Sequence, residues 1–184
     1  MNFNPLQHPI VFSNPLYLAT SSWIQHLPFG MFLIDALRPN IVVELGTHYG
    51  VSYCGFCQAV KTLGTDTRCY AVDNWHGDEH TGTYGSEVYQ QLSHYHDPRY
   101  GDFSKLLKMN FDDALPYFAD GSIDLLHIDG YHTYEAVRHD FETWLPKMSE
   151  RGVVILHDTN EREREFGVWR YWDELKTQYP SFEM

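Results

Sequence analysis

Four acidic residues stand where short apolar, β-branched segments of the sequence end. They are Glu44, Asp73, Asp129 and Asp158. In an open parallel α/β sheet, ligands bind beside the carboxyl ends of the strands. Acidic side chains that end several strands are therefore candidates to hold a ligand or an ion at one edge of the sheet.

Asp129 and Asp158 follow two segments that we expect to be neighbouring strands, about 4.8 Å apart. Their carboxylates could share one hard cation such as Mg²⁺, with water and substrate oxygens completing its shell. The alternative is structural, because Asp129 could cap the next helix and Asp158 could form a turn.

His132 and His157 lie close in sequence to these two aspartates. A hydroxyl group is a poor nucleophile at neutral pH and needs a base or a metal ion, and histidine titrates nearest to that pH. We therefore predict His132, Asp129 and His157 as catalytic residues, with His132 favoured as the base. The alternative for each histidine is an orienting hydrogen bond to the backbone.

A loop with two glycines follows Glu44. Gly46 permits a sharp turn close to a ligand, and the helix that we expect from Val51 offers free backbone N–H groups. A dinucleotide-binding fingerprint needs the pattern Gly-x-Gly-x-x-Gly, whereas this loop has glycine only at Gly46 and Gly50. The missing middle glycine counts against a nicotinamide-dependent oxidoreductase.

Asp73 ends the second apolar segment, where a carboxylate can accept hydrogen bonds from two ribose hydroxyls. Asn74 and Trp75 follow it directly. The Trp75 ring could pack against a purine, or it could belong to the core.

Strand and helix patterns alternate along the chain. They predict an α/β fold with a doubly wound, mostly parallel sheet that is covered by helices on both faces. The expected strands cover residues 41–45, 68–72, 106–109, 123–128 and 152–156, and the expected helices cover residues 51–63, 112–118, 132–147 and 168–179.

We predict that residues 1–184 form a single domain with three parts. An N-terminal helical arm covers 1–37, and a core covers 38–73 and 105–180. The remaining segment, 74–104, is rich in Tyr, His and Gly and does not fit the strand and helix rhythm. Insertions of this length are usually functional or mobile, so we expect a lid with one helix of about ten residues starting near Ser86.

Charge and composition limit the partners. The chain has 13 Lys and Arg against 25 Asp and Glu, a net charge of −12. This balance argues against nucleic-acid binding, because phosphate contacts need clustered cations. No apolar run approaches the roughly 18 residues of a membrane span. Three cysteines are too few for a disulfide framework and fit a reducing compartment, so we expect a cytoplasmic protein.

Two stretches of the sequence resemble known enzymes. The strand-turn-helix pattern at 42–50, followed by Asp73, resembles class I S-adenosylmethionine-dependent methyltransferases. The stretch 123–137, continued by 152–158, is similar to the group that includes the metal-dependent macrolide-sugar O-methyltransferases.

Two positions depart from that group. A second Asp is usual two residues after the fourth-strand Asp, where this sequence has Tyr131, and paired acids are frequent after the fifth strand, where it has His157 and Asp158. Methyltransferases of this class usually finish with an antiparallel hairpin. Only residues 181–184 remain for it here, so we expect the C-terminal hairpin to be missing.

The resemblance implies a Rossmann-like fold and the transfer of a methyl group from S-adenosyl-L-methionine to a hydroxyl oxygen, with Mg²⁺ at Asp129 and Asp158 as an optional second cofactor. It also implies a set of cofactor-binding residues. These are Glu44, Gly46, Thr47, Gly50, Ser52, Asp73, Asn74, Trp75 and Asp112.

The expected partner is a small-molecule or glycan acceptor, with a sugar or a glycosylated molecule favoured. A second copy of the chain in a homo-oligomer is an open alternative. Two rival functions also stay open: a non-catalytic cofactor-binding module of a polysaccharide-assembly protein and, less favoured, a nicotinamide-dependent oxidoreductase.

Overall fold

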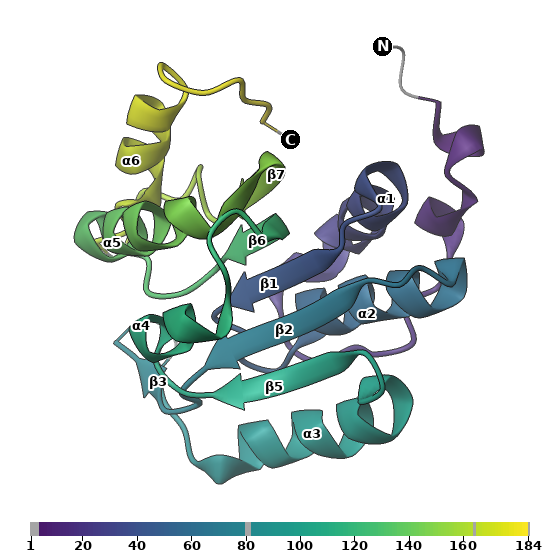
Figure 1. Ribbon diagram of the computed structural model, residues 1–184. Coiled ribbons are helices and arrows are strands. Elements are labelled where there is room, and N and C mark those ends of the chain that lie inside the picture. The colour runs from purple at the N-terminus through teal and green to yellow at the C-terminus, as the bar shows by residue number, and fades with distance from the viewer. Residues whose placement is uncertain (1–3, 80–81, 164, 184) are drawn as a thin grey trace.

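A five-stranded parallel sheet forms the centre of the computed structural model, which describes residues 4–79, 82–163 and 165–183 (Figure 1). Its strands, in spatial order, are β5 (Ser104–Lys108), β2 (Arg68–Asp73), β1 (Ile41–Leu45), β6 (Ile123–Ile128) and β7 (Met148–Leu156). All neighbouring strands run parallel. A small antiparallel ribbon of β3 (Gly77–Asp78) and β4 (Gly82–Thr83) follows β2.

The helices connect these strands. The α-helices are α1 (Leu27–Leu37), α2 (Val51–Leu63), α3 (Ser86–Tyr100), α4 (Phe111–Ala114), α5 (Tyr134–Trp144) and α6 (Val168–Leu175). Short 3₁₀ turns cover Pro5–Gln7, Pro9–Phe12, Ser22–His26, Leu115–Tyr117 and Leu145–Lys147. No helix in the described ranges is long and apolar enough to cross a bilayer.

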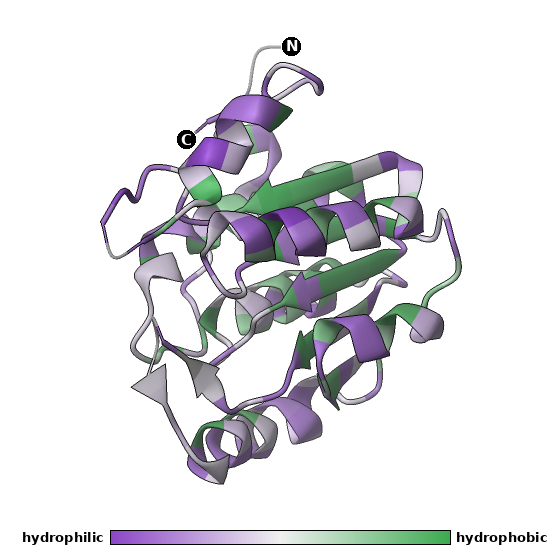
Figure 2. Cartoon of the chain, turned by 90° about the vertical axis from the view of Figure 1, so that its left-hand side faces the viewer, coloured by the Kyte–Doolittle hydropathy of each residue, from purple (hydrophilic) through white to green (hydrophobic). Residues whose placement is uncertain are grey.

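Both faces of the sheet are covered, because alternate residues of a strand point to opposite sides. Val42 of β1 and Leu125 of β6 belong to the core cluster that contains buried residues of α1, α2 and α3. Their neighbours Val43 and Leu126 belong to the second cluster, with buried residues of α4, α5 and α6. Figure 2 shows the central strands as mostly hydrophobic bands between helices of mixed character. These two layers confirm the predicted Rossmann-like fold.

The order of the strands creates a crevice between β1 and β6. From β1 the chain winds outward through β2 to β5, then returns to the other side of β1 and continues through β6 to β7. Ligands of open α/β sheets bind at such a reversal point, outside the carboxyl ends of the strands. The fold therefore places a candidate site beside Leu45 and Ile128.

The strand predictions agree closely with the structure at the centre of the sheet. The ranges 41–45 and 123–128 are reproduced without change. The last strand starts at Met148, four residues earlier than expected, because Ser149 and Arg151 are bound to the buried carboxylate of Asp124 on β6.

Within the described ranges no strand follows β7, which pairs only with β6, so the sheet is open at this edge. The predicted second copy of the chain stays a prediction.

The helix after β6 is shorter than the predicted 132–147. It starts at Tyr134 because the hydroxyl of Thr133 accepts the N–H of Ala136 and caps the first turn. It ends at Trp144, where Pro146 follows in a 3₁₀ turn. The last helix likewise ends at Leu175 rather than at 179.

The segment 74–104 differs from the expected lid. About half of it is α3, a helix of 15 residues that is longer than predicted and lies between β2 and β5 in the chain. Val88, Leu92, His96 and Tyr100 repeat every four residues and are buried against the sheet. The sequence concealed this face because two of its four members are His and Tyr. Only the part before Ser86, which contains the β3–β4 ribbon, stands at the carboxyl edge of the sheet.

The buried carboxyl of Asp140 on α5 gives a first testable prediction. Burial and, to a smaller extent, the nearby Asp112 carboxylate raise the pKa of Asp140 to about 7, against the opposing charge of His139. Because this pKa is higher in the folded than in the unfolded chain, Asp140 ionises first in the unfolded chain as pH rises. The free energy of unfolding should therefore fall between about pH 4 and pH 7 through this group.

Asp140→Asn removes the titration. The gain in stability of the variant over the wild type should grow from pH 4 to pH 8 by up to about 4 kcal/mol, since three pKa units correspond to that energy. Urea unfolding at several pH values measures it, with the exposed Asp66→Asn as the charge-matched control. Parallel pH profiles for wild type and Asp140→Asn would contradict the prediction.

Candidate functional site

The loops after β1 and β6 touch at Gly46. A Cβ atom at this position would lie 2.1 Å from the backbone oxygen of Asp129, and the φ angle of Gly46 is +83°. Two strand-like hydrogen bonds continue the sheet here, from Gly46 N–H to the Val72 carbonyl and from Asp129 N–H to the Leu45 carbonyl. Only glycine fits this contact, so Gly46 brings the predicted cofactor loop directly against the predicted catalytic loop.

Asp73 fastens the same loop from β2. Its Oδ2 accepts the backbone N–H groups of Thr47 at 2.8 Å and His48 at 2.9 Å, and its Oδ1 accepts the N–H of Trp75 at 2.6 Å. His48 and Trp75 both have positive φ angles, +49° and +53°, a conformation that costs a side-chain-bearing residue about 1–3 kcal/mol. The carboxylate of Asp73 therefore holds two strained turns in place.

Trp75 is 1% exposed and donates its indole N–H to the His48 carbonyl at 2.9 Å. Its ring packs edge-on against Tyr89 of α3, with 4.8 Å between the ring centres. Of the two interpretations that the sequence left open for Trp75, the structure shows core packing.

A cavity of about 220 Å³ lies at the crevice between β1 and β6. It contains four of the predicted site residues: Gly46, Asp73, Asn74 and Asp129. Tyr131, the position where the sequence departs from the related O-methyltransferases, also lines it. The other lining residues were not predicted as site residues, and they are His48, Gly77, Tyr84, Asn110, Phe111 and Gly130. Tyr131 also donates its hydroxyl to Glu79, beyond β3, at 3.2 Å.

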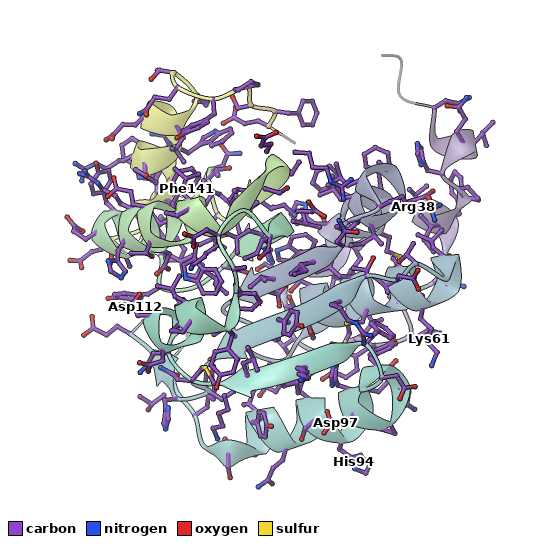
Figure 3. The ribbon with its side chains drawn as sticks, viewed as in Figure 1. Arg38, Lys61, His94, Asp97, Asp112 and Phe141 are labelled. Carbon is purple, nitrogen blue, oxygen red and sulfur yellow. The ribbon has the colours of Figure 1, made fainter. Side chains whose placement is uncertain are left out.

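The signal for Asn110 and Phe111 was present in the sequence. Both stand just after the carboxyl end of β5, and Asp73 stands at the carboxyl end of β2. Position at the carboxyl end of a strand was the basis for predicting the acids, and the same reasoning applies to Asn110 and Phe111. The predicted Asp112 instead lies in α4 at the outer surface, with a 59% exposed side chain paired to His139 at 3.0 Å (Figure 3). It does not line the cavity.

Three other predicted cofactor residues lie in the loop after β1 or in the first turn of α2. Thr47 and Ser52 are buried, at 4% and 6% exposure. Gly50 precedes the first turn of α2 with a φ angle of +78°, and a Cβ there would meet Leu92 of α3 at 2.4 Å. Gly50 is thus required by the packing of α3 against α2. A role of these three residues in cofactor binding stays a prediction.

Glu44 is fully buried and paired with His127, a residue that was not among the predicted site residues. Its Oε2 lies 2.8 Å from Nδ1 of His127, the partner of Glu44 across β1 and β6, and both side chains are 0% exposed. The rings of Trp23 and Phe56 cover His127 edge-on. Burial raises the pKa of the Glu44 carboxyl, and the hydrogen bond and charge of His127 oppose this shift.

Asp129, His132, His157 and Asp158 form one cluster beside the cavity. Nε2 of His132 lies 3.2 Å from Asp129 and 3.1 Å from Asp158, and Nδ1 of His157 lies 3.3 Å from Asp129 and 3.1 Å from Asp158. One ligand atom of each residue lies within 4.8 Å of all the others. The predicted neighbourhood of Asp129 and Asp158 is therefore present, and both predicted histidines join it.

Charge compensation dominates this cluster. Although burial disfavours charge, the two carboxylates raise the pKa of His132 to about 9 and that of His157 to about 10. In return the histidines hold the pKa of Asp158 at about 2 and that of Asp129 well below its usual range. Without an added cation, two imidazolium groups face two carboxylates at neutral pH. A divalent cation that replaced both protons would leave the net charge unchanged, so the donor set fits such an ion.

The N-terminal arm also contributes to this site, which the sequence did not reveal. The Trp23 ring stacks on His157 with 6.0 Å between the centres, and His26 lies edge-on to His157 at 5.9 Å. Phe166 stacks on His132 at 4.7 Å. These rings fix the orientation of both histidines.

Comparison with known proteins agrees with this arrangement. A family model described as "Methyltransferase domain" matches residues 43–159, the part of the chain from β1 to the end of the cluster. The chain belongs to this methyltransferase family. An uncharacterized protein of Sinorhizobium fredii, y4gI, is 54% identical to this chain over 161 residues. The aligned part is 88% of this chain but only 18% of that relative's length.

Solved structures share the fold at low sequence identity. The O-methyltransferase TomG of Streptomyces achromogenes, in complex with SAM, is 15% identical with a TM-score of 0.63, covering 89% of this chain and 71% of TomG. The SAH-bound methyltransferase PaMTH1 of Podospora anserina is 17% identical with a TM-score of 0.61, covering 86% of this chain and 66% of PaMTH1. A methyltransferase of Geobacter sulfurreducens is 15% identical, with a TM-score of 0.61 and coverages of 97% and 81%.

The Glu44–His127 pair provides a prediction for stability. His127→Leu leaves the Glu44 carboxyl buried without its partner, and loss of one member of a buried pair costs about 3–5 kcal/mol. The double variant Glu44→Leu with His127→Leu should lose less, because two apolar side chains of similar size suit the same environment. Chemical unfolding measures both, with the exposed His139→Leu as the matched control. A double variant that is as unstable as His127→Leu alone would overturn this interpretation.

Proposed function

We propose that this methyltransferase domain transfers the methyl group of S-adenosylmethionine to a hydroxyl oxygen of a sugar or of a glycosylated small molecule. The observation that supports the proposal most is the double position of Asp129. It lines the cavity together with Gly46 and Asp73, and it is also a member of the histidine–aspartate cluster. A cofactor in the cavity and a hydroxyl at the cluster would therefore be neighbours.

The lining of the cavity suits an adenosine-containing cofactor. A carboxylate has about four acceptor positions, and Asp73 uses three of them for the loop, which leaves one for a ribose hydroxyl. Asn110 adds an amide and Phe111 an aromatic ring, as a purine base requires. S-adenosylmethionine would supply a methyl group attached to a positively charged sulfur.

The protein's part in such a reaction is mainly positioning, because a well-oriented nucleophile about 3 Å from the methyl carbon needs little further help. Asp129 and Asp158 are the residues that would hold a divalent cation, whose Lewis acidity would favour ionisation of the bound hydroxyl. His132 can accept the hydroxyl proton only as a neutral imidazole. The charge of its two carboxylate partners must then be balanced by another cation.

Two features favour a sugar-type acceptor over other hydroxyl compounds. The stretch 123–158 resembles the macrolide-sugar O-methyltransferases, and aromatic side chains stand at the cavity, among them Tyr84 and Tyr131. We also propose a reducing, cytoplasmic location, since all three cysteines are free thiols.

Asp73 tests the cofactor part of the proposal. Asp73→Ala should weaken the binding of S-adenosylhomocysteine by about 1.5–3 kcal/mol, the scale of a hydrogen bond to a charged group. It should also lower the melting temperature, because three hydrogen bonds to the loop are lost. Calorimetric titration measures the affinity. Asp112→Ala is the matched control, since this carboxylate pairs with His139 and does not line the cavity, so its loss should leave the affinity unchanged. Unchanged affinity for Asp73→Ala in a folded protein would remove Asp73 from the cofactor site.

Chelation tests the acceptor part. Removal of divalent ions and the substitution Asp158→Asn should each reduce turnover by at least about 100-fold, because an amide is a poorer ligand than a carboxylate. Both should leave S-adenosylhomocysteine binding nearly intact. Transfer of labelled methyl to a panel of sugars and glycosides measures turnover, with the exposed Asp102→Asn as control.

The outcomes separate the alternatives. If turnover survives chelation but falls by about 10²–10⁴-fold in His132→Ala, the histidine alone is the base. If the cofactor binds and no hydroxyl compound is methylated, the domain is a cofactor-binding module.

A further inference from the structure

We propose that Asp129, His132, His157 and Asp158 together form a site for a first-row transition-metal dication, such as Mn²⁺, Fe²⁺ or Zn²⁺, in preference to Mg²⁺. This inference deepens the proposed function and rests on the same site, because it identifies the class of ion that would stand beside the acceptor. It adds both histidines to the two aspartates as ligands, so that Nε2 of His132 would bind the ion and His132 would not act as the base.

The distances fit a single ion. Both histidines lie near Oδ1 of Asp129, at 3.2 and 3.3 Å, and each lies 3.1 Å from one oxygen of Asp158, Oδ2 for His132 and Oδ1 for His157. Neighbouring ligands in an octahedron with bonds of about 2.1–2.2 Å are about 3.0 Å apart, and those around a tetrahedral ion about 3.3 Å apart. All four ligand atoms lie within 4.8 Å of one another, so shifts of a few tenths of an ångström bring them around one centre.

The orientation of His157 supports an ion rather than a hydrogen-bonded network. Its Nδ1 is buried and makes no hydrogen bond with any described residue, although oxygens of Asp129 and Asp158 lie 3.3 and 3.1 Å away. A metal ion between them would use this nitrogen and would satisfy a buried polar atom that is otherwise costly.

The surroundings hold the ligands in place, as metal sites require. Trp23 stacks on the ring of His157, and Phe166 stacks on the ring of His132 with planes only 17° apart. Asp158 has a φ angle of +56°, a strained conformation that turns its carboxylate back toward both histidines.

The donor types determine the choice of ion. Mg²⁺ prefers an all-oxygen shell with several waters. Imidazole nitrogen binds first-row transition metals more strongly than Mg²⁺, with affinity rising from Mn²⁺ through Fe²⁺ to Zn²⁺. Half of the protein ligands here are imidazoles. Four protein ligands also leave up to two positions of a six-coordinate ion for acceptor oxygens, which suits a hydroxyl substrate.

Direct binding tests the proposal. The full chain, freed of metals by chelation and dialysis, is titrated with Mn²⁺ while electron paramagnetic resonance measures the free ion, and Mg²⁺ is then added as competitor. We expect one Mn²⁺ per chain and a preference for Mn²⁺ over Mg²⁺ of at least about 100-fold. Equal affinity for both ions, or no Mn²⁺ binding to the folded chain, would refute the proposal.

Two variants test the histidines separately. His157→Asn and His132→Asn should each weaken the binding of Mn²⁺ by at least about tenfold. They should weaken the binding of Mg²⁺ less, because each removes only a nitrogen ligand. His94→Gln, an exposed histidine on the outer side of α3, is the matched control and should bind Mn²⁺ like the wild type (Figure 3). Circular dichroism shows which variants fold. A folded His157→Asn or His132→Asn with wild-type Mn²⁺ affinity would exclude that histidine as a ligand and overturn the proposed site.

Parallel calorimetry with S-adenosylhomocysteine separates this inference from the proposed function. Selective Mn²⁺ binding without cofactor binding would support the metal site and contradict methyl transfer. Cofactor binding with no preference for Mn²⁺ would contradict the metal site alone.

Discussion

A side chain at position 46 would collide with the backbone oxygen of Asp129, 2.1 Å from its Cβ, so the loops after β1 and β6 can meet only through glycine. This contact lies at the point where the winding of the sheet reverses. It gives the cavity and the histidine–aspartate cluster one common wall. Every later property of the site depends on it, because a displaced Asp129 would leave both the cavity and its two histidine partners.

Charge compensation is the second constraint, since buried charges are tolerated only in balanced groups. Glu44 lies against His127, and Asp129 and Asp158 lie against His132 and His157. Three residues with left-handed backbone, His48, Trp75 and Asp158, lie around the same edge. Strain of this kind persists only where surrounding contacts over-determine it, and the three hydrogen bonds to Asp73 provide such contacts for two of these residues.

The sequence predicted those features that follow from periodicity and from position along a strand. Continuous apolar runs identified the central strands, and acids at strand ends identified Asp73, Asp129 and Asp158. The pairing of Glu44 with His127 could not be found in this way, because it depends on the register between β1 and β6. The face of α3 was concealed for a different reason, since His96 and Tyr100 are buried where a sequence pattern expects aliphatic residues. The stacking of Trp23 on His157 joins residues 134 positions apart and requires the fold itself.

His157 and Tyr131 stand where the O-methyltransferases that this stretch resembles usually have acids, which has a consequence for the proposed chemistry. Methyl transfer removes the positive charge of a sulfonium, so excess negative charge beside the reaction centre would stabilise the reactants more than the transition state. A dication with two aspartates and two neutral histidines has no net charge. An all-acid site with the same dication would be negative. If the proposed cation binds here, the two histidines would keep the site neutral, so the site would add no field that opposes neutralisation of the sulfonium. Asp129, which lines the cavity and belongs to the cluster, would then lie between the cation and the cofactor.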